Sequence, residues 1–92
     1  MQFKQKARID RWCVVPKPGA EDPRILVLMG QIVDHPASNG CGVTSDLLWY
    51  SASFRMAETK NTFYELGEPD PSWVKQLEAE GHTISSLEPT IP

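Results

Sequence analysis

The side chains best suited to metal chemistry are few and widely spaced. Cys13, His35, Cys41 and His82 are the only cysteines and histidines of the chain. Structural zinc sites usually bring two ligands together at a spacing of about two to four residues. The nearest pair here is His35 and Cys41, which are separated by a loop that contains proline and glycine. We therefore predict no metal site and no cofactor.

Nucleophilic catalysis would need Cys41 or Ser45 with His35 as the base. The sequence has neither the G-x-S-x-G turn of hydrolases nor a known motif around a cysteine. Glu58 and Glu65 flank a short turn and could face each other across a hairpin, where paired carboxylates raise a pKa. Two exposed charges at strand ends are the simpler interpretation. We predict a non-enzymatic protein, with a small enzyme as the alternative.

Composition and charge narrow the functional class further. The 92 residues are 40% apolar and 23% charged, which is typical of one globular domain. The net charge is −3, although residues 1–24 hold six of the nine cations, so a generic nucleic-acid binder is disfavoured. No leader segment and no apolar run of about 20 residues is present. We expect a cytoplasmic protein with no membrane contact and two free thiols.

The apolar pattern predicts strands at residues 7–15 and 24–33, which pair as a hairpin across a proline-rich loop. Strict alternation along the first strand places Ile9 and Trp12 on opposite faces of the sheet. The second strand is apolar on both faces, so we expect it at the centre of the sheet. Gly30 within it predicts a bulge or the close approach of another backbone.

The second half of the chain concentrates its aromatic residues in short segments. Residues 43–50 predict a third strand or a short turn, and residues 51–58 alternate, with Phe54 directed toward the core. Residues 62–66 predict a last strand, exposed at the edge of the sheet. The sequence thus indicates an α+β fold with a small antiparallel sheet of four to five strands. That sheet is either open or curled toward a barrel.

One short C-terminal helix is predicted over residues 70–81. Asp70 is a suitable N-cap, Pro71 fits the first helical position, and Gly81 is a natural C-terminal residue. A helix this short must pack its apolar stripe on the sheet to be stable. We expect a single α+β domain over residues 1–81, followed by a loosely attached tail over residues 82–92.

Aromatic residues beside charges indicate a protein-binding surface. One helix covers one face of a sheet, so part of the aromatic excess should lie on the other face, unless the sheet curls and buries it. The predicted protein-binding residues are Trp49, Tyr50, Arg55, Lys60, Phe63, Glu65, Glu68 and Asp70. The acidic members, with Glu78 and Glu80 of the helix, would engage a basic groove or mimic phosphate.

The alternative function is a small β-sheet module that binds nucleic acid directly. Aromatic platforms with neighbouring basic residues bind single strands. The residues that would form this site are Arg8, Arg11, Trp12 and Arg24, joined by Arg55. The acidic remainder of the chain makes direct nucleic-acid binding the weaker of the two hypotheses.

Three segments carry a resemblance: GQIVDHP at residues 30–36, VTS at 43–45 and TKNTFYELG at 59–67. With these, residues 24–67 resemble short phage- and prophage-encoded accessory proteins of bacteria. The resemblance implies an inhibitor or adaptor of phage or bacterial origin. In its most concrete form this is an anti-CRISPR-type anti-defence protein, which binds a host protein or ribonucleoprotein complex and blocks it. We expect a monomer, or a homodimer formed through the edge strand at residues 62–66.

Overall fold

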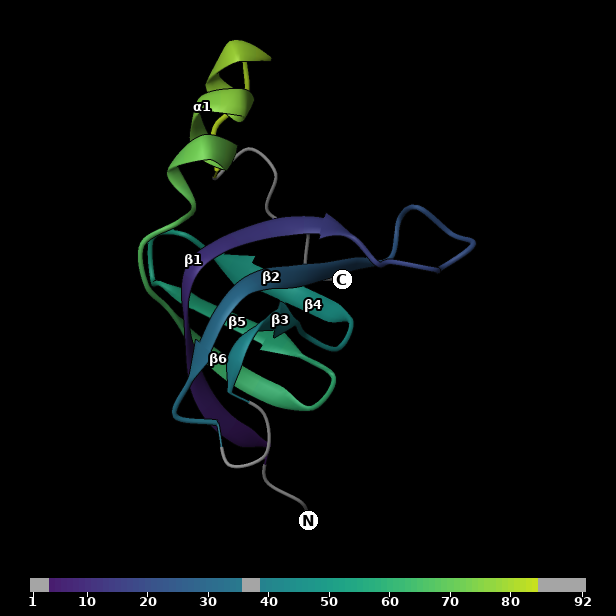
Figure 1. Cartoon of the computed structure of the whole chain (residues 1–92), viewed down its shortest axis with the longest axis vertical. Coiled ribbons are helices and arrows are strands. Elements are labelled where there is room, and N and C mark those ends of the chain that lie inside the picture. The colour runs from purple at the N-terminus through teal and green to yellow at the C-terminus, as the bar shows by residue number, and fades with distance from the viewer. Residues whose placement is uncertain (1–3, 36–38, 85–92) are drawn as a thin grey trace.

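A computed structural model of the protein describes residues 4–35 and 39–84, and within them one sheet and one helix (Figure 1). The elements are β1 (Gln5–Pro16), β2 (Leu26–Val33), β3 (Gly40–Val43), β4 (Leu47–Ser51), β5 (Met56–Thr59), β6 (Thr62–Leu66) and α1 (Pro71–Ala79). The six strands form one sheet in the order β3-β2-β1-β6-β5-β4. The predicted α+β class is confirmed, with six strands where four to five were expected.

The sheet is mixed, so the prediction of a wholly antiparallel sheet is wrong. β1 and β6 pair in parallel, with Ala7 opposite Tyr64, and all other neighbouring strands are antiparallel. These two strands occupy the centre, while β3 and β4 form the edges. The expected edge position of residues 62–66 and the expected central position of residues 24–33 are therefore also wrong. Parallel pairing joins segments far apart in the sequence and leaves no local turn signal.

The sheet is strongly curled. Its edge strands β3 and β4 are separated along the chain by only three residues, Thr44 to Asp46. In a flat sheet the two edges would lie about 24 Å apart, whereas the linking segment can span at most about 14 Å. The sheet must therefore bend until the end of β3 lies within reach of the start of β4. No ladder joins β3 to β4 in the described chain, so the sheet approaches a barrel without closing.

The bend between β3 and β4 is fixed by Thr44. Its backbone amide donates to the Leu28 carbonyl over 2.9 Å, and its hydroxyl accepts from the Leu28 amide over 3.0 Å. The same hydroxyl donates to the Ser45 carbonyl over 2.8 Å. This buried threonine therefore attaches the chain to β2 at the point where it leaves β3 and crosses to β4.

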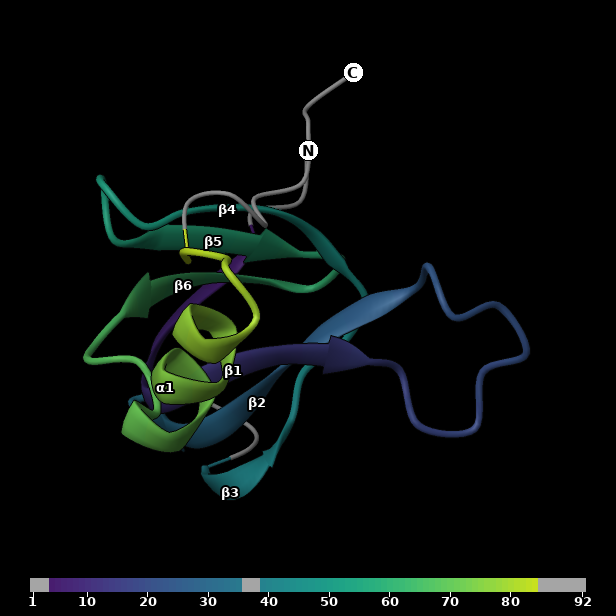
Figure 2. The same cartoon turned by 90° about the horizontal axis from the view of Figure 1, so that it is seen from above.

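The concave side of the sheet holds the core, and α1 lies over one end of it (Figures 1 and 2). The buried core residues are Ala7, Ile9, Trp12, Leu28, Ile32, Tyr50, Ala57, Tyr64 and Leu66. The rings of Trp12 and Trp73 are 5.5 Å apart, and Leu77 is also buried. The expected packing of the apolar stripe of the helix on the sheet is confirmed for Trp73. Burial of this apolar stripe stabilises a helix too short to persist alone.

The ends of the helix follow the predicted caps. The Asp70 carboxylate accepts from the Ser72 amide over 2.9 Å. At the other end Gly81 has a φ of 79°, and the His82 amide donates to the Leu77 carbonyl over 2.8 Å. This is the glycine-containing Schellman arrangement, which satisfies the last carbonyls of a helix.

The segment after the helix begins against the core. Ile84 packs against the core, and its carbonyl accepts from the Tyr50 hydroxyl over 2.7 Å. Residues 85–92 lie outside the described residues. The expected division into a domain over residues 1–81 and a loose tail over residues 82–92 therefore stays a prediction.

A bulge in β1 lies opposite Gly30 of β2, as the sequence predicted. The pairing of the two strands slips by one residue between Asp10 and Cys13, so Arg11 and Trp12 together oppose one glycine. Arg11 has a φ of 50°, in the left-handed region that non-glycine residues rarely adopt. A Cβ atom on Gly30 would lie 2.7 Å from the Asp10 carbonyl oxygen and 3.0 Å from the Trp12 Cα. Only glycine leaves enough space for the bulged backbone.

The bulge changes which side chains of β1 face the core. Ile9 and Trp12 are both buried, with 0% and 2% of their surface exposed, so their predicted placement on opposite faces is wrong. The extra residue shifts the alternation and turns Trp12 inward. There its Nε1 donates to the Gly67 carbonyl over 2.8 Å, and its ring meets Tyr50 edge-on at 5.7 Å. This gives a buried indole the hydrogen-bond partner that it needs.

The predicted strand at residues 51–58 is interrupted. β4 ends at Ser51, a turn occupies residues 52–55, and β5 begins at Met56. Phe54 lies in this turn and is 80% exposed, so its expected place in the core is wrong. Arg55 of the same turn has a φ of 54°, which reverses the chain where the alternating pattern indicated continuous strand.

Candidate functional site

The convex face of β4, β5, β6 and β1 carries eight side chains in two rows that follow the strand register. The first row is Trp49, Glu58, Phe63 and Lys6, and the second is Ser51, Met56, Glu65 and Arg8. The residues between them in each strand, such as Tyr50 and Tyr64, are buried in the core. Because side chains alternate along a strand, the two rows point away from the core. We call these eight residues the outer grid.

The first row of the outer grid is held in place by one carboxylate. Glu58 accepts from Trp49 Nε1 over 2.8 Å and from the Lys4 ammonium. The same ammonium donates to the Thr59 carbonyl over 2.9 Å and lies 5.5 Å from the centre of the Phe63 ring. The hydrogen bond from Lys4, followed by that from Trp49, lowers the pKa of Glu58. The Glu58 carboxylate is ionised, and Lys4 compensates its charge. It thus orients the Trp49 indole directly and the Phe63 ring through Lys4.

A hollow of about 500 Å³ lies between the two rows. Its walls are Lys6, Phe63, Met56 and Glu65, and its remaining lining comes from Ala7 and Tyr64, which are buried on the other side of the sheet. Met56 is 45% exposed and Phe63 is partly buried. The hollow is therefore a mainly apolar depression with one cation and one anion at its rim.

Three of the predicted protein-binding residues meet in the outer grid: Trp49, Phe63 and Glu65. Tyr50 does not join them, because its ring is 2% exposed and its hydroxyl is bonded to the Ile84 carbonyl. A side chain buried to this extent has almost no surface for a partner. Tyr50 is a core residue that orients the segment after the helix.

The other predicted contact residues are spread along neighbouring turns. Arg55 lies with its Nη2 atom 3.8 Å from the Glu68 carboxylate. Lys60, at the tip of the β5–β6 hairpin, lies 3.3 Å from the Asp46 carboxylate. Asp70 caps the helix. Arg55, Lys60 and Glu68 are exposed, and exposed ion pairs of this kind contribute little to stability.

The predicted nucleic-acid residues are brought together only in part, since Arg8 and Arg11 line one hollow together with Asp10 and Glu68. Trp12 is buried in the core and has no ring face on which a base can stack. Arg8 belongs to the outer grid and contacts Asp10 over 3.0 Å. Arg11 lines a second hollow, and Arg24 lies in the loop that projects beyond β1 and β2 in Figure 1. The structure therefore does not assemble these four residues into one aromatic and basic platform.

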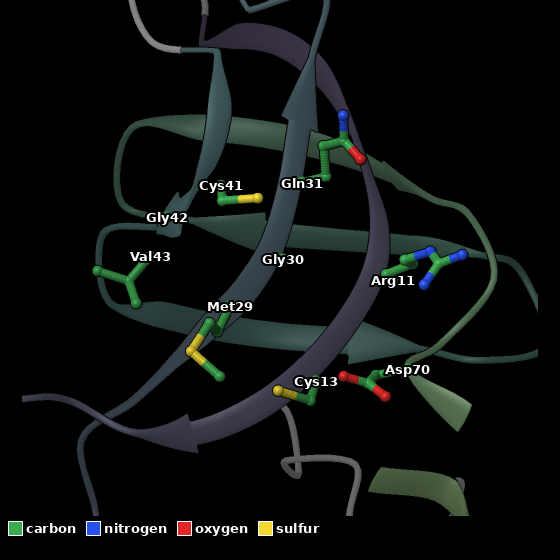
Figure 3. Close-up of a pocket in the computed structure, with 9 residues that line it drawn as sticks. All are labelled: Arg11, Cys13, Met29, Gly30, Gln31, Cys41, Gly42, Val43 and Asp70. Atoms are coloured by element: carbon green, nitrogen blue, oxygen red, sulfur yellow. The ribbon is translucent and has the colours of Figure 1, made fainter. Parts of the chain in front are cut away.

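The second hollow lies over β1, β2 and β3 on the same convex side and has a volume of about 420 Å³ (Figure 3). Met29 and Val43 line it and are 44% and 47% exposed. Cys41 is exposed, whereas Cys13 is buried. Burial, followed by the charge of Asp70, raises the pKa of the Cys13 thiol. The two thiols therefore differ in reactivity, although both are free.

The residues weighed for metal or nucleophilic chemistry are held by other contacts. His35 Nε2 lies 3.2 Å from the Thr62 hydroxyl, and its ring stacks against Tyr64. Within residues 4–35 and 39–84, no three His, Cys, Asp or Glu side chains form a group that could hold a metal ion. Glu58 and Glu65 do not face each other, because their partners across the hairpin are Phe63 and Met56.

Sequence reasoning missed Lys6 and Met56 as members of the candidate site. Lys6 comes beside Phe63 only through the parallel pairing of β1 with β6. Met56 lies two residues after Phe54, so alternation predicts the same face for both, whereas the turn at residues 52–55 separates them. The alternation of Lys4, Lys6 and Arg8 was the available signal, since it marks one polar face at the start of β1.

Comparison of the chain with protein-family models, with curated proteins and with solved structures gives no match. The resemblance of residues 24–67 to phage accessory proteins therefore stays a hypothesis. No helix among the described residues is long and apolar enough to cross a membrane.

Proposed function

We propose that this protein is a non-enzymatic inhibitor or adaptor that binds another protein through the outer grid. The observation that carries the proposal is the placement of Met56 and Phe63 around one hollow on a sheet face, with Trp49 in the same row of the outer grid as Phe63. Aromatic side chains and methionine are enriched at protein interfaces, and a few such residues supply most of the binding energy.

The rigidity of the outer grid also favours binding. Glu58 fixes the Trp49 indole through a 2.8 Å hydrogen bond, and Lys4 joins this acid to the Phe63 ring. Side chains that are already ordered lose little conformational entropy when a partner covers them. The alternative nucleic-acid module lacks comparable support, because Trp12, its stacking residue, is buried.

The more specific form of the proposal concerns origin and target. The resemblance of residues 24–67 supports a protein of phage or bacterial origin that acts inside a bacterial host. An anti-CRISPR-type anti-defence protein, which blocks a host protein or ribonucleoprotein complex, is its most concrete version. Outside the hollow, the exposed acid Glu68 and the net charge of −3 suit a target whose surrounding surface is basic.

Site-specific photocrosslinking tests the proposal. A benzophenone amino acid placed at Met56 or at Ser51 would probe the outer grid, and the same group at Lys75 on the exposed side of α1 is the matched control. In nuclease-treated bacterial lysate we expect one protein to be captured from both grid positions and not from the control. The capture should be lost in a Phe63→Ala background whose circular dichroism spectrum and melting temperature show a folded domain.

Equal capture of the same proteins from all three positions would contradict the proposal, since it would show no preference for the grid. Capture that is seen in untreated lysate and lost after nuclease treatment would instead support the nucleic-acid-binding module.

A further inference from the structure

We propose that the outer grid recognises a partner segment in which a large apolar side chain, best an aromatic one, stands beside a carboxylate. The apolar side chain enters the hollow, and the carboxylate pairs with Lys6. This inference rests on the proposed function, because it names the chemistry of the partner that the same face would bind.

The shape and lining of the hollow select an apolar side chain. Its volume of about 500 Å³ is in the range of small ligand sites. Phe63 offers a ring, and Met56 on the neighbouring strand offers a flexible thioether, which makes favourable contacts with aromatic rings. The methylene stem of Lys6 closes the β1 side and leaves its ammonium at the rim.

The charges of the outer grid select a carboxylate. Glu58 is already neutralised by Lys4, and Glu65 lies 3.7 Å from Arg8. Lys6 has no ion pair among the described residues, yet it stands directly beside Phe63. With Lys4 and Asp10 included, this face has three cations and three anions, and the ion pairs of the described residues join Lys4 to Glu58 and Arg8 to Asp10 and Glu65. A partner anion would therefore meet the one uncompensated charge next to the hollow.

A cationic partner segment fits this position less well. Its positive charge would lie beside the Lys6 ammonium. Glu65, the one acid at the rim of the hollow, already forms an ion pair with Arg8. Like charges that are brought together and desolvated oppose binding. The sign of the partner charge is therefore the part of the inference that an experiment can decide.

Nuclear magnetic resonance titration of the full chain with three small probes supplies the test. N-acetyl-phenylalanine carries the aromatic ring and a carboxylate, N-acetyl-phenylalaninamide is its neutral form, and phenylalaninamide is its cationic form. We expect the acid to shift the amides of Phe63 and Glu65 and the indole of Trp49, with a dissociation constant of about 1 mM. The neutral probe should bind about threefold more weakly, and the cationic probe more weakly still.

Two variants separate the parts of the site. Lys6→Gln should reduce the affinity of the acid to that of the neutral probe, whereas Lys75→Gln on α1 should leave it unchanged. Met56→Ala should weaken the acid and the neutral probe by the same factor, because it removes a wall and no charge. Unchanged amide spectra away from the grid would show that each variant remains folded.

Three results would overturn the inference: no shift at the grid with any probe, tighter binding of the cationic probe, or an equal loss from Lys6→Gln and Lys75→Gln. The photocrosslinking result distinguishes this failure from that of the proposed function. If the crosslinker at position 56 captures a partner while N-acetyl-phenylalanine does not bind, the inferred chemistry of the partner is wrong. The proposal that the outer grid is a binding face is then still supported.

Discussion

Replacing Gly30 with alanine should destabilise the protein strongly, and the same change at its neighbour should not. Gly30 and Gly42 are direct partners in the β2–β3 ladder, so both positions lie in the same part of the sheet. A Cβ atom at Gly30 would lie 2.7 Å from the Asp10 carbonyl oxygen and 3.1 Å from that of Arg11. At Gly42 no atom lies within 4 Å of the added carbon. Neither glycine has a positive φ, so the contrast tests space rather than backbone strain.

The magnitude follows from the atoms that must move. Both close contacts at Gly30 are backbone atoms of the bulge, and relief requires β1 to shift relative to β2. Overpacking in a tight site costs about 1–3 kcal/mol. The same shift would loosen the buried hydrogen bond from Trp12 to the Gly67 carbonyl, which adds about 1–3 kcal/mol if it is lost. We expect Gly30→Ala to cost about 2–4 kcal/mol. Gly42→Ala should change stability by less than about 1 kcal/mol, toward higher stability.

Urea and thermal unfolding of the two variants provide the assay. For a domain of this size, each 1 kcal/mol corresponds to about 4–8 °C in melting temperature. Gly30→Ala should therefore melt well below the wild type, and its tryptophan fluorescence should show a more exposed Trp12. Equal melting temperatures for the two alanine variants would refute the close approach of the bulge to β2, and with it the physical account of this glycine.

Three further predictions concern single side chains. Lys4 and then Trp49 lower the pKa of Glu58, so the ionised acid should stabilise the fold above its ordinary pKa of 4.5. This stabilisation should be lost as the pH falls through the lowered pKa, and Glu58→Gln should weaken the pH dependence of the free energy of unfolding. Cys41 should react first with a disulfide reagent, whereas Cys13, with its raised pKa and buried thiol, should react slowly until the pH rises or the domain unfolds; similar rates would contradict its burial. Trp12→Phe should cost about 1–3 kcal/mol because it leaves a buried carbonyl unpaired, and Trp49→Phe, at a partly exposed hydrogen bond, less.

Local sequence signals predicted the local features of this fold. The hairpin of β1 and β2, the bulge at Gly30, the short hairpin that ends in β6 and both caps of α1 agree with the patterns that indicated them. Each of these depends on residues close together in the chain: a turn, a glycine or a capping carboxylate. The edge strand β3 is an exception, because its four residues are all exposed and show no apolar alternation, so the pattern indicated a glycine-containing loop there.

The features that the sequence did not predict are non-local. The parallel pairing of β1 with β6 joins segments near the two ends of the domain, and nothing in either segment specifies the partner. This pairing brings Lys6 and Arg8 beside Phe63 and Glu65, so the two grid residues of β1 could not be placed there by sequence reasoning. The aromatic residues Trp49 and Phe63 could be recognised, because β4, β5 and β6 pair through local hairpins.

The bulge in β1 connects the core to the outer grid. Without an extra residue, alternation from Ala7 and Ile9 would place Arg11 inside the curled sheet and Trp12 on its convex side. A buried guanidinium without a partner is costly, and the core would lose its largest ring. The bulge keeps Lys6 and Arg8 outward before it and turns Trp12 inward after it. Gly30 therefore affects both surfaces, since the space that it leaves lets one strand carry cations on the outer grid and an indole in the core.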